Sequence, residues 1–440
     1  TASTDSPFDD PAGFVFGDSG DQNVIKCGSY VGNGSTGTNA NDVYLGFEPQ
    51  FILLKNATDT GTDWMLLNSM SGIPGSSGHS PYLGPNTSDE EKQDDVRLQV
   101  TSTGFSPTDS DDTFNKNGET YIFMCIRRPD GYVGKPPGAG EGTSVFNMVM
   151  GTSNSDIPAF VSGFVTDFAT TKYTTTSQGW YTSARLTQGK YLFTNTADAE
   201  SSDSNQQYDF NNGYYDGTSD MSNYQAWMWS RGQGFDCICY KGDGVAGRQI
   251  NHSMNNTIEM IWTKRRSPAA GWRVWHKGLN GGGSNAATYY LSLNETDAET
   301  SNGDIYGSSS SILPTSTHWT VGSNAAVNES GSDFITMLFA STDVSAVGSY
   351  TGTDADINLS LGFTPRLFIV KIADGTGSWH VFDTLRGITS NGAPRLELNS
   401  TSAQNTSAHY VEPYTNGIKI VESGAALTDS GKTYIYYAHA

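Results

Sequence analysis

The chain repeats one block of ten residues four times, and this repetition limits its possible folds more than any local propensity does. Each block ends in a lysine, and a tryptophan follows each lysine eight or nine residues later. The blocks are 46–55, 163–172, 255–264 and 362–371. The tryptophans are Trp64, Trp180, Trp272 and Trp379. Repetition at a spacing of about 100 residues predicts a chain of tandem modules.

Further segments recur in the same order within each repeat. A tyrosine followed by a glycine-bearing turn opens three repeats, at 28–34, 239–244 and 348–352. Closing runs rich in aromatic and β-branched residues lie at 117–126, 330–339 and 430–438, and 223–229 takes this place in the second repeat. We therefore predict an N-terminal arm over 1–21 and four modules. Modules 1 to 4 span 22–130, 144–232, 233–342 and 343–440.

The apolar runs predict an all-β fold. They are short, rich in Ile, Val, Phe, Tyr, Trp and Thr, and bracketed by Gly, Asn, Asp and Ser. No helical periodicity persists for three turns. We therefore predict four tandem β-sandwiches of jelly-roll or concanavalin-like type. The runs 51–54 and 367–370 are apolar on both faces, which predicts central strands covered on both sides, whereas Lys419 between two isoleucines predicts a half-exposed strand.

Composition excludes some partners. The net charge is -21, from 25 basic and 46 acidic residues, whereas phosphate contacts require clustered Lys and Arg. We therefore expect no nucleic-acid partner, and we interpret the basic run 264–266 as a solvated strand end. No stretch approaches membrane-spanning length and no signal-like apolar segment opens the chain, so we expect no membrane insertion.

The four cysteines and the acidic clusters predict neither a disulfide framework nor a metal site. Cys27 and Cys125 fall in strands that could be neighbours and could pair, whereas Cys237 and Cys239 lie on one side of one strand and are poorly placed to bond each other. Buried free thiols are the favoured interpretation. The acidic runs 109–112 and 354–356 do not fit a calcium loop and suit solvated turns. We expect no metal and no cofactor.

No catalytic constellation emerges, so the chain is not expected to be an enzyme. The seven histidines lie outside known catalytic motifs, and paired carboxylates cannot be distinguished among 46 acidic residues. The four aligned tryptophans could stack on sugars, but their identical placement favours a core role. Tyr214 and Tyr215, beside Asn212-Gly213, are the candidate receptor contacts, although Asn-Gly next to aromatic residues is also an ordinary hairpin signal.

The repeated motifs are also those of a protein family. Gly-Ser-Tyr-x-Gly-Asn-Gly stands at 28–34, Gly-Phe-x-Pro at 46–49, Trp-x-Val-x-Asp-x-x-Arg-Gly at 379–387 and Tyr-Ile-Tyr-Tyr-Ala at 434–438. Together they resemble the modules of virion structural and tail-fibre proteins of marine bacteriophages, especially cyanophages. Module 2 departs most, with Thr166 in place of the proline and an Asn-, Asp- and Tyr-rich segment at 201–222.

The resemblance implies a non-enzymatic virion surface protein. It would be made in the host cytoplasm without a signal peptide and would sit in a tail fibre or its surroundings, where it contacts a host surface glycan or protein. The implied partners include other virion proteins, and fibre proteins commonly assemble as homotrimers. A capsid-decorating or secreted adhesive protein that only packs against other subunits is the alternative. A depolymerase that cleaves envelope polysaccharides is a third possibility.

Overall fold

The structure is a computed structural model. It describes residues 24–35, 41–73, 80–92, 97–128, 142–152, 157–187, 189–216, 220–307, 312–407, 409–422 and 427–440. Strands dominate this part of the chain, and its only α-helix is the four-residue α1 (Ala325–Asn328). Short 3-10 helices are η3 (Gly142–Ser144), η4 (Arg185–Thr187), η5 (Leu279–Gly281) and η6 (Gly283–Thr288). The prediction of an all-β fold is confirmed.

Each sheet in the described residues takes its strands from within one of the four predicted module ranges. In module 1, β1-β7-β3-β4 form one antiparallel sheet and β2-β6-β5 form a second. The strands are β1 (Ile25–Val31), β2 (Val43–Tyr44), β3 (Pro49–Asn56), β4 (Met65–Asn68), β5 (Leu98–Thr101), β6 (Gly104–Pro107) and β7 (Thr120–Arg127). Phe105 of the second sheet meets Tyr30 and Phe123 of the first edge-on, so the two sheets form a sandwich.

Module 2 has a six-stranded sheet, β13-β12-β11-β10-β16-β8, and a three-stranded sheet, β14-β15-β9. Its strands are β8 (Phe146–Met150), β9 (Phe160–Val161), β10 (Phe168–Tyr173), β11 (Tyr181–Ala184), β12 (Lys190–Phe193), β13 (Ser201–Ser202), β14 (Gln206–Gln207), β15 (Gly213–Asp216) and β16 (Tyr224–Trp229). A separate apolar cluster that includes Phe160, Tyr208 and Tyr214 fills the space between the two sheets.

Modules 3 and 4 follow the same plan, with main sheets β17-β24-β19-β20 and β25-β32-β27-β28-β29. The module 3 strands are β17 (Phe235–Lys241), β18 (Arg248–Asn251), β19 (Met260–Ser267), β20 (Arg273–His276), β21 (Tyr289–Tyr290), β22 (Thr300–Ser301), β23 (His318–Val321) and β24 (Asp333–Phe339). The module 4 strands are β25 (Ser345–Thr351), β26 (Ile357–Ser360), β27 (Leu367–Ile372), β28 (His380–Asp383), β29 (Leu396–Glu397), β30 (Val411–Tyr414), β31 (Gly417–Ile420) and β32 (Thr433–His439). Smaller sheets β18-β23, β21-β22 and β26-β31-β30 complete them.

The repeated ten-residue block becomes the same strand in every module, namely β3, β10, β19 and β27. Its pairing with the next strand has one register throughout. The matching pairs are Leu53 with Leu66, Thr170 with Thr182, Trp262 with Val274, and Ile369 with Val381. The divergent module 2 therefore keeps the common central sheet, and positions can be compared residue by residue across all four modules.

The first residue of each block has a positive φ. The angle is 85° at Gly46, 88° at Gly163, 89° at Gly362 and 51° at Asn255. Glycine adopts this left-handed conformation without a steric penalty, and asparagine tolerates it better than most residues. The block therefore begins with Gly in three modules and with Asn in module 3 because the chain turns there into the central strand.

The tyrosine-glycine motif has an equally local cause. A Cβ on Gly32, Gly242 or Gly352 would lie 2.2, 2.2 and 2.0 Å from a carbonyl oxygen of the loop before the closing strand. Only glycine permits this close approach of two backbones. The preceding tyrosine in module 1, Tyr30, stacks on Tyr121 of the closing strand at 5.0 Å and thereby ties the first strand to the last.

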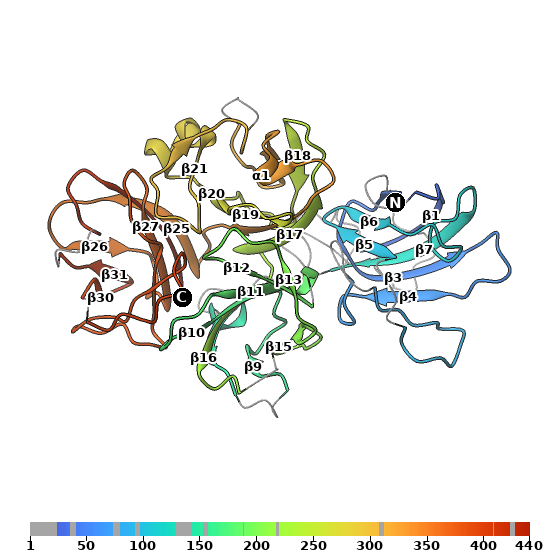
Figure 1. Cartoon of the computed structure of the whole chain (residues 1–440), viewed down its shortest axis with the longest axis horizontal. Helices are drawn as coiled ribbons and strands as arrows, with labels where there is room; N and C mark the ends of the chain where they lie inside the picture. Colours follow the sequence, from blue (N-terminus) through green and yellow to red (C-terminus); the bar gives the residue numbers. More distant parts are fainter. Residues whose placement is uncertain are drawn as a thin grey trace, which may run out of the picture.

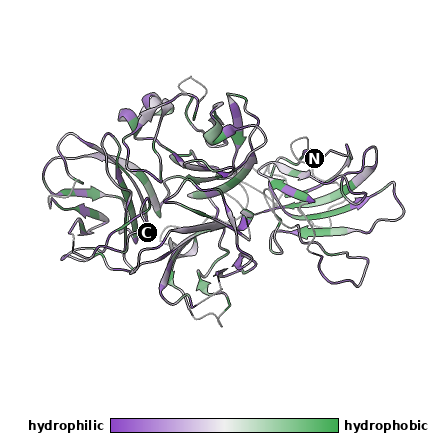
Figure 2. Cartoon of the chain, viewed as in Figure 1, coloured by the Kyte–Doolittle hydropathy of each residue, from purple (hydrophilic) through white to green (hydrophobic). Residues whose placement is uncertain are grey.

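Modules 2, 3 and 4 cluster around a common centre, and module 1 projects to one side (Figure 1). In Figure 2, apolar stretches lie on the strands of every module, including those of module 1. The central strand β27 is buried at every position from Leu367 to Ile372, as predicted for a strand covered on both faces. The prediction was wrong for β3, where Phe51, Leu53 and Lys55 are only half-buried.

Two smaller predictions need correction in whole or in part, and two are confirmed. Lys264 and Arg266 are fully buried rather than solvated, because module 2 covers this strand end. Cys27 lies opposite Met124 rather than Cys125 and is exposed, so it is not a buried thiol and does not pair. The other three cysteines are buried free thiols, as expected. Lys419 lies half-buried between two buried isoleucines, as predicted.

Candidate functional site

The tryptophans that follow the block lysines in modules 2, 3 and 4 join these modules into a closed ring. The indole nitrogen of Trp180 in module 2 donates to the carbonyl oxygen of Glu397 in module 4 at 2.8 Å. Trp272 of module 3 donates to Phe193 of module 2 at 2.8 Å, and Trp379 of module 4 donates to Ser292 of module 3 at 3.0 Å. The acceptors are at equivalent positions, one residue after the strand leucine. We call this three-module assembly the ring.

The block lysines repeat the same cycle. Lys172, Lys264 and Lys371 are fully buried. Their ammonium groups donate to carbonyl oxygens of the next module, at Thr401 (2.8 Å), Ala197 (3.3 Å) and Thr296 (3.2 Å), respectively. Burial lowers the pKa of each lysine to about 8. Each ammonium group also donates to carbonyl oxygens near its own strand, which offset part of its desolvation.

Backbone hydrogen bonds complete each of the three ring interfaces. The amide of Glu200 donates to the carbonyl of Arg266, that of Glu299 to Ala373, and that of Gln404 to Thr174. All three bonds measure 2.7 Å and link equivalent positions. At the centre, Trp229 of module 2 contacts Phe235 of module 3 and donates to the Tyr437 hydroxyl of module 4 at 3.2 Å. The ring is therefore one packed body with pseudo-three-fold symmetry.

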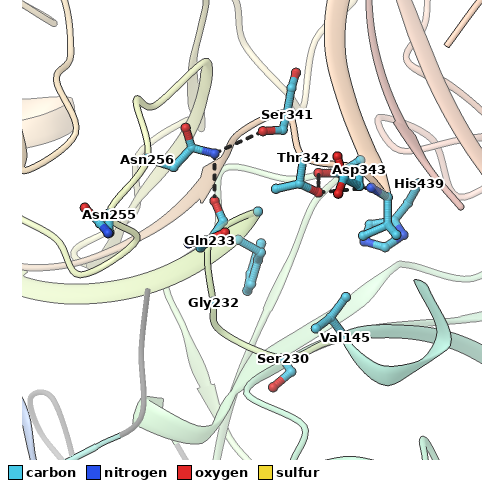
Figure 3. Close-up of a pocket in the computed structure, with 14 residues that line it drawn as sticks. Val145, Ser230, Gly232, Gln233, Asn255, Asn256, Ser341, Thr342, Asp343 and His439 are labelled. Carbon is cyan, nitrogen blue, oxygen red and sulfur yellow. Dashed lines mark hydrogen bonds between the residues drawn. The ribbon is translucent and has the colours of Figure 1, made fainter. Parts of the chain in front are cut away.

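A cavity of about 340 Å³ opens where the chain passes between ring modules (Figure 3). It is lined from module 2 by Val145, Ser230 and Gly232, from module 3 by Gln233, Gly234, Phe235, Asn255, Asn256, Ser341 and Thr342, and from module 4 by Asp343, Val344, Ser345 and His439. Neighbouring segments hold the wall in place, since the Asn256 side chain donates to the carbonyls of Gln233 at 3.2 Å and Ser341 at 3.0 Å. All three ring modules therefore build this site.

The lining is suited to a neutral polar ligand. The lining combines amide, hydroxyl and backbone groups with apolar surface in equal share, and Asp343 is the single carboxylate among the lining residues. Burial lowers the pKa of His439 to about 3, so its imidazole is neutral at physiological pH. Phe235 is 4% exposed and stacks on Phe168 and Trp229, so its ring offers little surface to a ligand. Neutral donors and acceptors are the groups that recognise sugar hydroxyls, which both donate and accept.

The predicted receptor contacts lie elsewhere. Tyr214 is 1% exposed, where it stacks on Phe160 and Tyr208 between the two sheets of module 2. It therefore cannot touch a partner. Asn212-Gly213 is not a hairpin turn either, because Gly213 begins β15 and pairs with Val161. Tyr215 is half-buried on the same strand. No motif marked the cavity residues; the polar character of the module boundaries at 230–234 and 341–345 was the available signal.

Module 1 meets the ring through buried charges. Arg128 of module 1 contacts Glu48 at 3.3 Å and Asp236 of module 3 at 3.1 Å. Arg231 of module 2 donates to Glu48 at 2.9 Å, and its backbone amide donates to Asp167 at 2.8 Å. We call these five residues the junction cluster. Its charges are almost fully buried, so they depend on one another for compensation.

A second, more open cleft of about 650 Å³ separates module 1 from module 3 beside the junction cluster. Tyr44, Gln99 and Thr101 line one side, and Lys241 and Arg248 line the other. Within the described residues, no group of His, Cys, Asp and Glu side chains has the arrangement of a metal site. None of the helices in this part of the chain is long and apolar enough to cross a membrane.

Comparison with known proteins finds one family. The family model described as "Domain of unknown function (DUF7483)" matches residues 19–128 and 218–440. The matched residues include nearly all of module 1 and all of modules 3 and 4, whereas most of module 2 lies outside the match. No curated protein matches the sequence.

Proposed function

The chain belongs to the DUF7483 family, and we propose that it is a surface protein of a phage virion, in or near a tail fibre, that binds glycans of the host envelope. The observation that carries this proposal is the cavity that three interlocked modules build from neutral hydrogen-bonding groups. The resemblance of the repeated motifs to those of marine phage virion proteins supports the same location. The partners proposed are a host surface glycan and neighbouring virion proteins.

The ring fixes the positions of the residues that line the proposed site. A sugar loses affinity when its hydroxyls and their partners must be ordered on binding, so a preformed wall favours recognition. The wall segments are held by bonds within and between modules, such as Thr342 with Ser345 at 2.9 Å and Ser345 with Ala340 at 2.8 Å. A site with few charges suits weak, neutral contacts, which gain strength when several copies act together.

The proposed site can be tested by substitution at its rim. Gln233→Ala and Asp343→Ala each remove one hydrogen-bonding side chain from the cavity lining. We expect each variant to bind extracted host-envelope glycan about tenfold more weakly, the effect of a hydrogen bond worth ~1.4 kcal/mol. Glu422→Ala, an exposed residue outside the cavity, is the matched control. Equal glycan binding by all three variants and the native chain would contradict the site.

The same assay separates the alternatives. Attachment to host cells and release of reducing ends are measured together on the intact chain. Binding without release is the expected result, because the cavity lining contains one carboxylate whereas most glycosidases use two. Release of reducing ends would instead favour a depolymerase. Absence of both host attachment and glycan binding would favour a capsid-decorating or adhesive packing protein, and would overturn the proposed function.

A further inference from the structure

Within the part of the chain that the structure describes, the main sheet of module 1 has one covered face and one uncovered face. Ile52, Leu54, Leu67, Tyr121, Phe123 and Cys125 point into the sandwich and are buried. The alternate positions point the other way and are half-buried or exposed. These outer-face residues are Ile25, Cys27, Phe51, Leu53, Leu66, Ile122, Met124 and Ile126, with Leu83 on the adjoining edge. We call this set the outer face.

The central positions of the same face are covered in the ring. Ile122 is 39% exposed, whereas the residues at its position in modules 2, 3 and 4, which pair with the block lysines, are 0 to 3% exposed. Those residues are Gln225, Ile335 and Ile435. Leu83 is likewise 39% exposed, whereas Leu192, Leu291 and Leu396 are 6%, 1% and 1% exposed. The outer face therefore has the apolar character of a ring interface without a module against it.

Module 1 also has the hydrogen-bonding groups of a ring interface. Trp64 occupies the position of the ring tryptophans, and its backbone amide is bonded to Asn86 as theirs are to Asn195, Asn294 and Asn399. Its indole nitrogen has no hydrogen-bond partner within the described residues, and the residue is half-buried rather than fully buried. Among the described residues, Lys55 bonds to its own turn alone, at Asn56, Asp59 and Thr62.

The acceptor side of the interface is present as well. The asparagine that bonds each tryptophan amide fixes the alignment. The carbonyls that accept from the ring lysines lie two residues after it, which is Ser88 in module 1. The carbonyls that accept from the ring indoles lie two residues before it, which is Gly84 in module 1. The backbone pair formed by Glu200 and Arg266 corresponds to Glu91 and Ala57, both exposed in module 1. Each module 1 therefore carries both halves of the interface, donors on one side and acceptors on the other.

We infer that module 1 binds module 1 of two further copies of the chain, in a three-fold ring built like that of modules 2 to 4. A module that carries both halves makes a head-to-tail interface, and such an interface closes when the rotation between subunits divides the circle evenly. The ring shows that this interface closes after three modules. In the trimer, Trp64 would donate to Gly84 and Lys55 to Ser88 of the neighbouring copy.

Charge agrees with this partner. Lys264 of the ring lies beside Asp198 and Glu200 of its neighbour, and both acids favour its charged form. The corresponding module 1 residues are Lys55 on one side and Asp89 and Glu91 on the other. An intermolecular contact would therefore bring a cation to two exposed acids. The inference rests on the comparison of module interfaces and is independent of the proposed function.

The mass of the full chain in solution tests the inference. We expect analytical ultracentrifugation to give three times the 47.3 kDa of one chain. Ile122→Lys places a charge at the middle of the outer face, where the single chain tolerates it because the position is 39% exposed. This variant should be a monomer with an unchanged circular dichroism spectrum. Val245→Lys, at a 61% exposed position in module 3, is the matched control and should remain a trimer.

Cys27 provides a second measurement on the same molecules. It is the exposed cysteine of the four, and the residues at its position in the ring, Met148, Cys237 and Val347, are 7%, 0% and 3% exposed. A maleimide should therefore react with Cys27 in the Ile122→Lys monomer and not in the native trimer. This measurement keeps the test valid even if the variant folds imperfectly, since the native protein alone must protect its thiol.

Several outcomes would overturn the inference. A native chain that is monomeric, dimeric or tetrameric lacks the three-fold ring. An Ile122→Lys variant that stays trimeric would show that the trimer forms through another surface. A monomeric native chain with a protected Cys27 would show that another segment of the same chain covers the outer face.

Discussion

Tryptophans at equivalent positions in the four modules differ in how deeply they are buried. Trp379 is 1% exposed because module 3 covers it and accepts its indole hydrogen bond, whereas Trp64, with the same backbone bond to an asparagine, is half-buried. The core role predicted for the repeated tryptophans is confirmed for the ring. Their indole nitrogens also make them contacts between modules, so each side chain contributes both apolar area and a specific acceptor position.

We expect Trp379→Ala to lower the free energy of unfolding of the full chain by ~3 to 5 kcal/mol, because it leaves a cavity between modules 3 and 4. Trp379→Phe keeps most of the apolar volume but loses the bond to Ser292, and should cost ~1 kcal/mol. Urea denaturation followed by circular dichroism measures both. Trp64→Ala, measured on the Ile122→Lys background, is the matched control. It should lower the free energy of unfolding by less than Trp379→Ala does. A similar loss at both sites would contradict the role of the ring in burying Trp379.

The buried lysines predict a pH dependence. Burial lowers the pKa of Lys371 to about 8, against ~10.4 in an unfolded chain. Between these values the unfolded state holds more protons, so this lysine makes the free energy of unfolding rise with pH, by at most ~1.4 kcal/mol per unit. The buried thiols act in the opposite direction but are present in every variant. Lys371→Met should therefore reduce the slope between pH 8 and 10, and an unchanged slope would contradict the burial of this ammonium group.

At the scale of elements, close backbone approaches explain the repeated turns. Gly32 lies where the first strand passes over the loop before β7, and its amide donates to Glu119 at 2.8 Å. The recurrence of this contact at Gly242 and Gly352 explains why the tyrosine-glycine motif survives while the neighbouring residues vary. The motif thus maintains the pairing of the first strand with the last.

Gly32→Ala should destabilise the chain by at least ~2 kcal/mol, because the added Cβ would lie 2.2 Å from the carbonyl oxygen of Lys116. Gly61→Ala is a suitable control in the same module, since its nearest neighbour is 3.5 Å away and its φ is not positive. Its effect should stay within ~1 kcal/mol. Thermal unfolding measures the melting temperatures of both variants and of the native chain. Equal decreases in melting temperature for the two variants would contradict this account.

At the scale of the whole molecule, two kinds of contact join the modules. The ring is held by apolar side chains, indole bonds, backbone bonds and the buried charges of the block lysines and Arg266, whereas module 1 is attached through the junction cluster and flanked by an open cleft. A buried ion pair becomes unfavourable when one partner is removed. The position of module 1 should therefore be sensitive to a single charge change in the junction cluster.

Asp236→Asn removes one acid from the junction cluster and leaves Arg128 with less compensation. We expect module 1 to move away from the ring, with a cost of ~3 to 5 kcal/mol to their contact. Small-angle X-ray scattering of the Ile122→Lys background should then show a larger radius of gyration. Asp356→Asn, which disrupts the more exposed pair with Lys419, is the control and should leave the radius unchanged. A native radius in both variants would show that other contacts hold module 1.

The sequence by itself determined the repetition, the all-β class and the common central strand, because these depend on local patterns that recur in every module. The glycine and asparagine at the block start and the glycine after the tyrosine report backbone geometry directly. The same patterns could not show that Lys264 and Arg266 are buried or that Tyr214 lies between sheets. A similar block is buried throughout β27 but half-buried on one face of β3, so local sequence does not specify what lies against it.

Only the tertiary structure decided how the modules meet. The bonds from Trp180, Trp272 and Trp379 join residues between about 79 and 217 positions apart, and no local preference encodes which carbonyl accepts them. The cavity is likewise made of boundary segments that become neighbours when the ring closes. Module contacts form because each uncovered apolar sheet face must be removed from water, and the identity of its partner depends on the geometry of the whole chain.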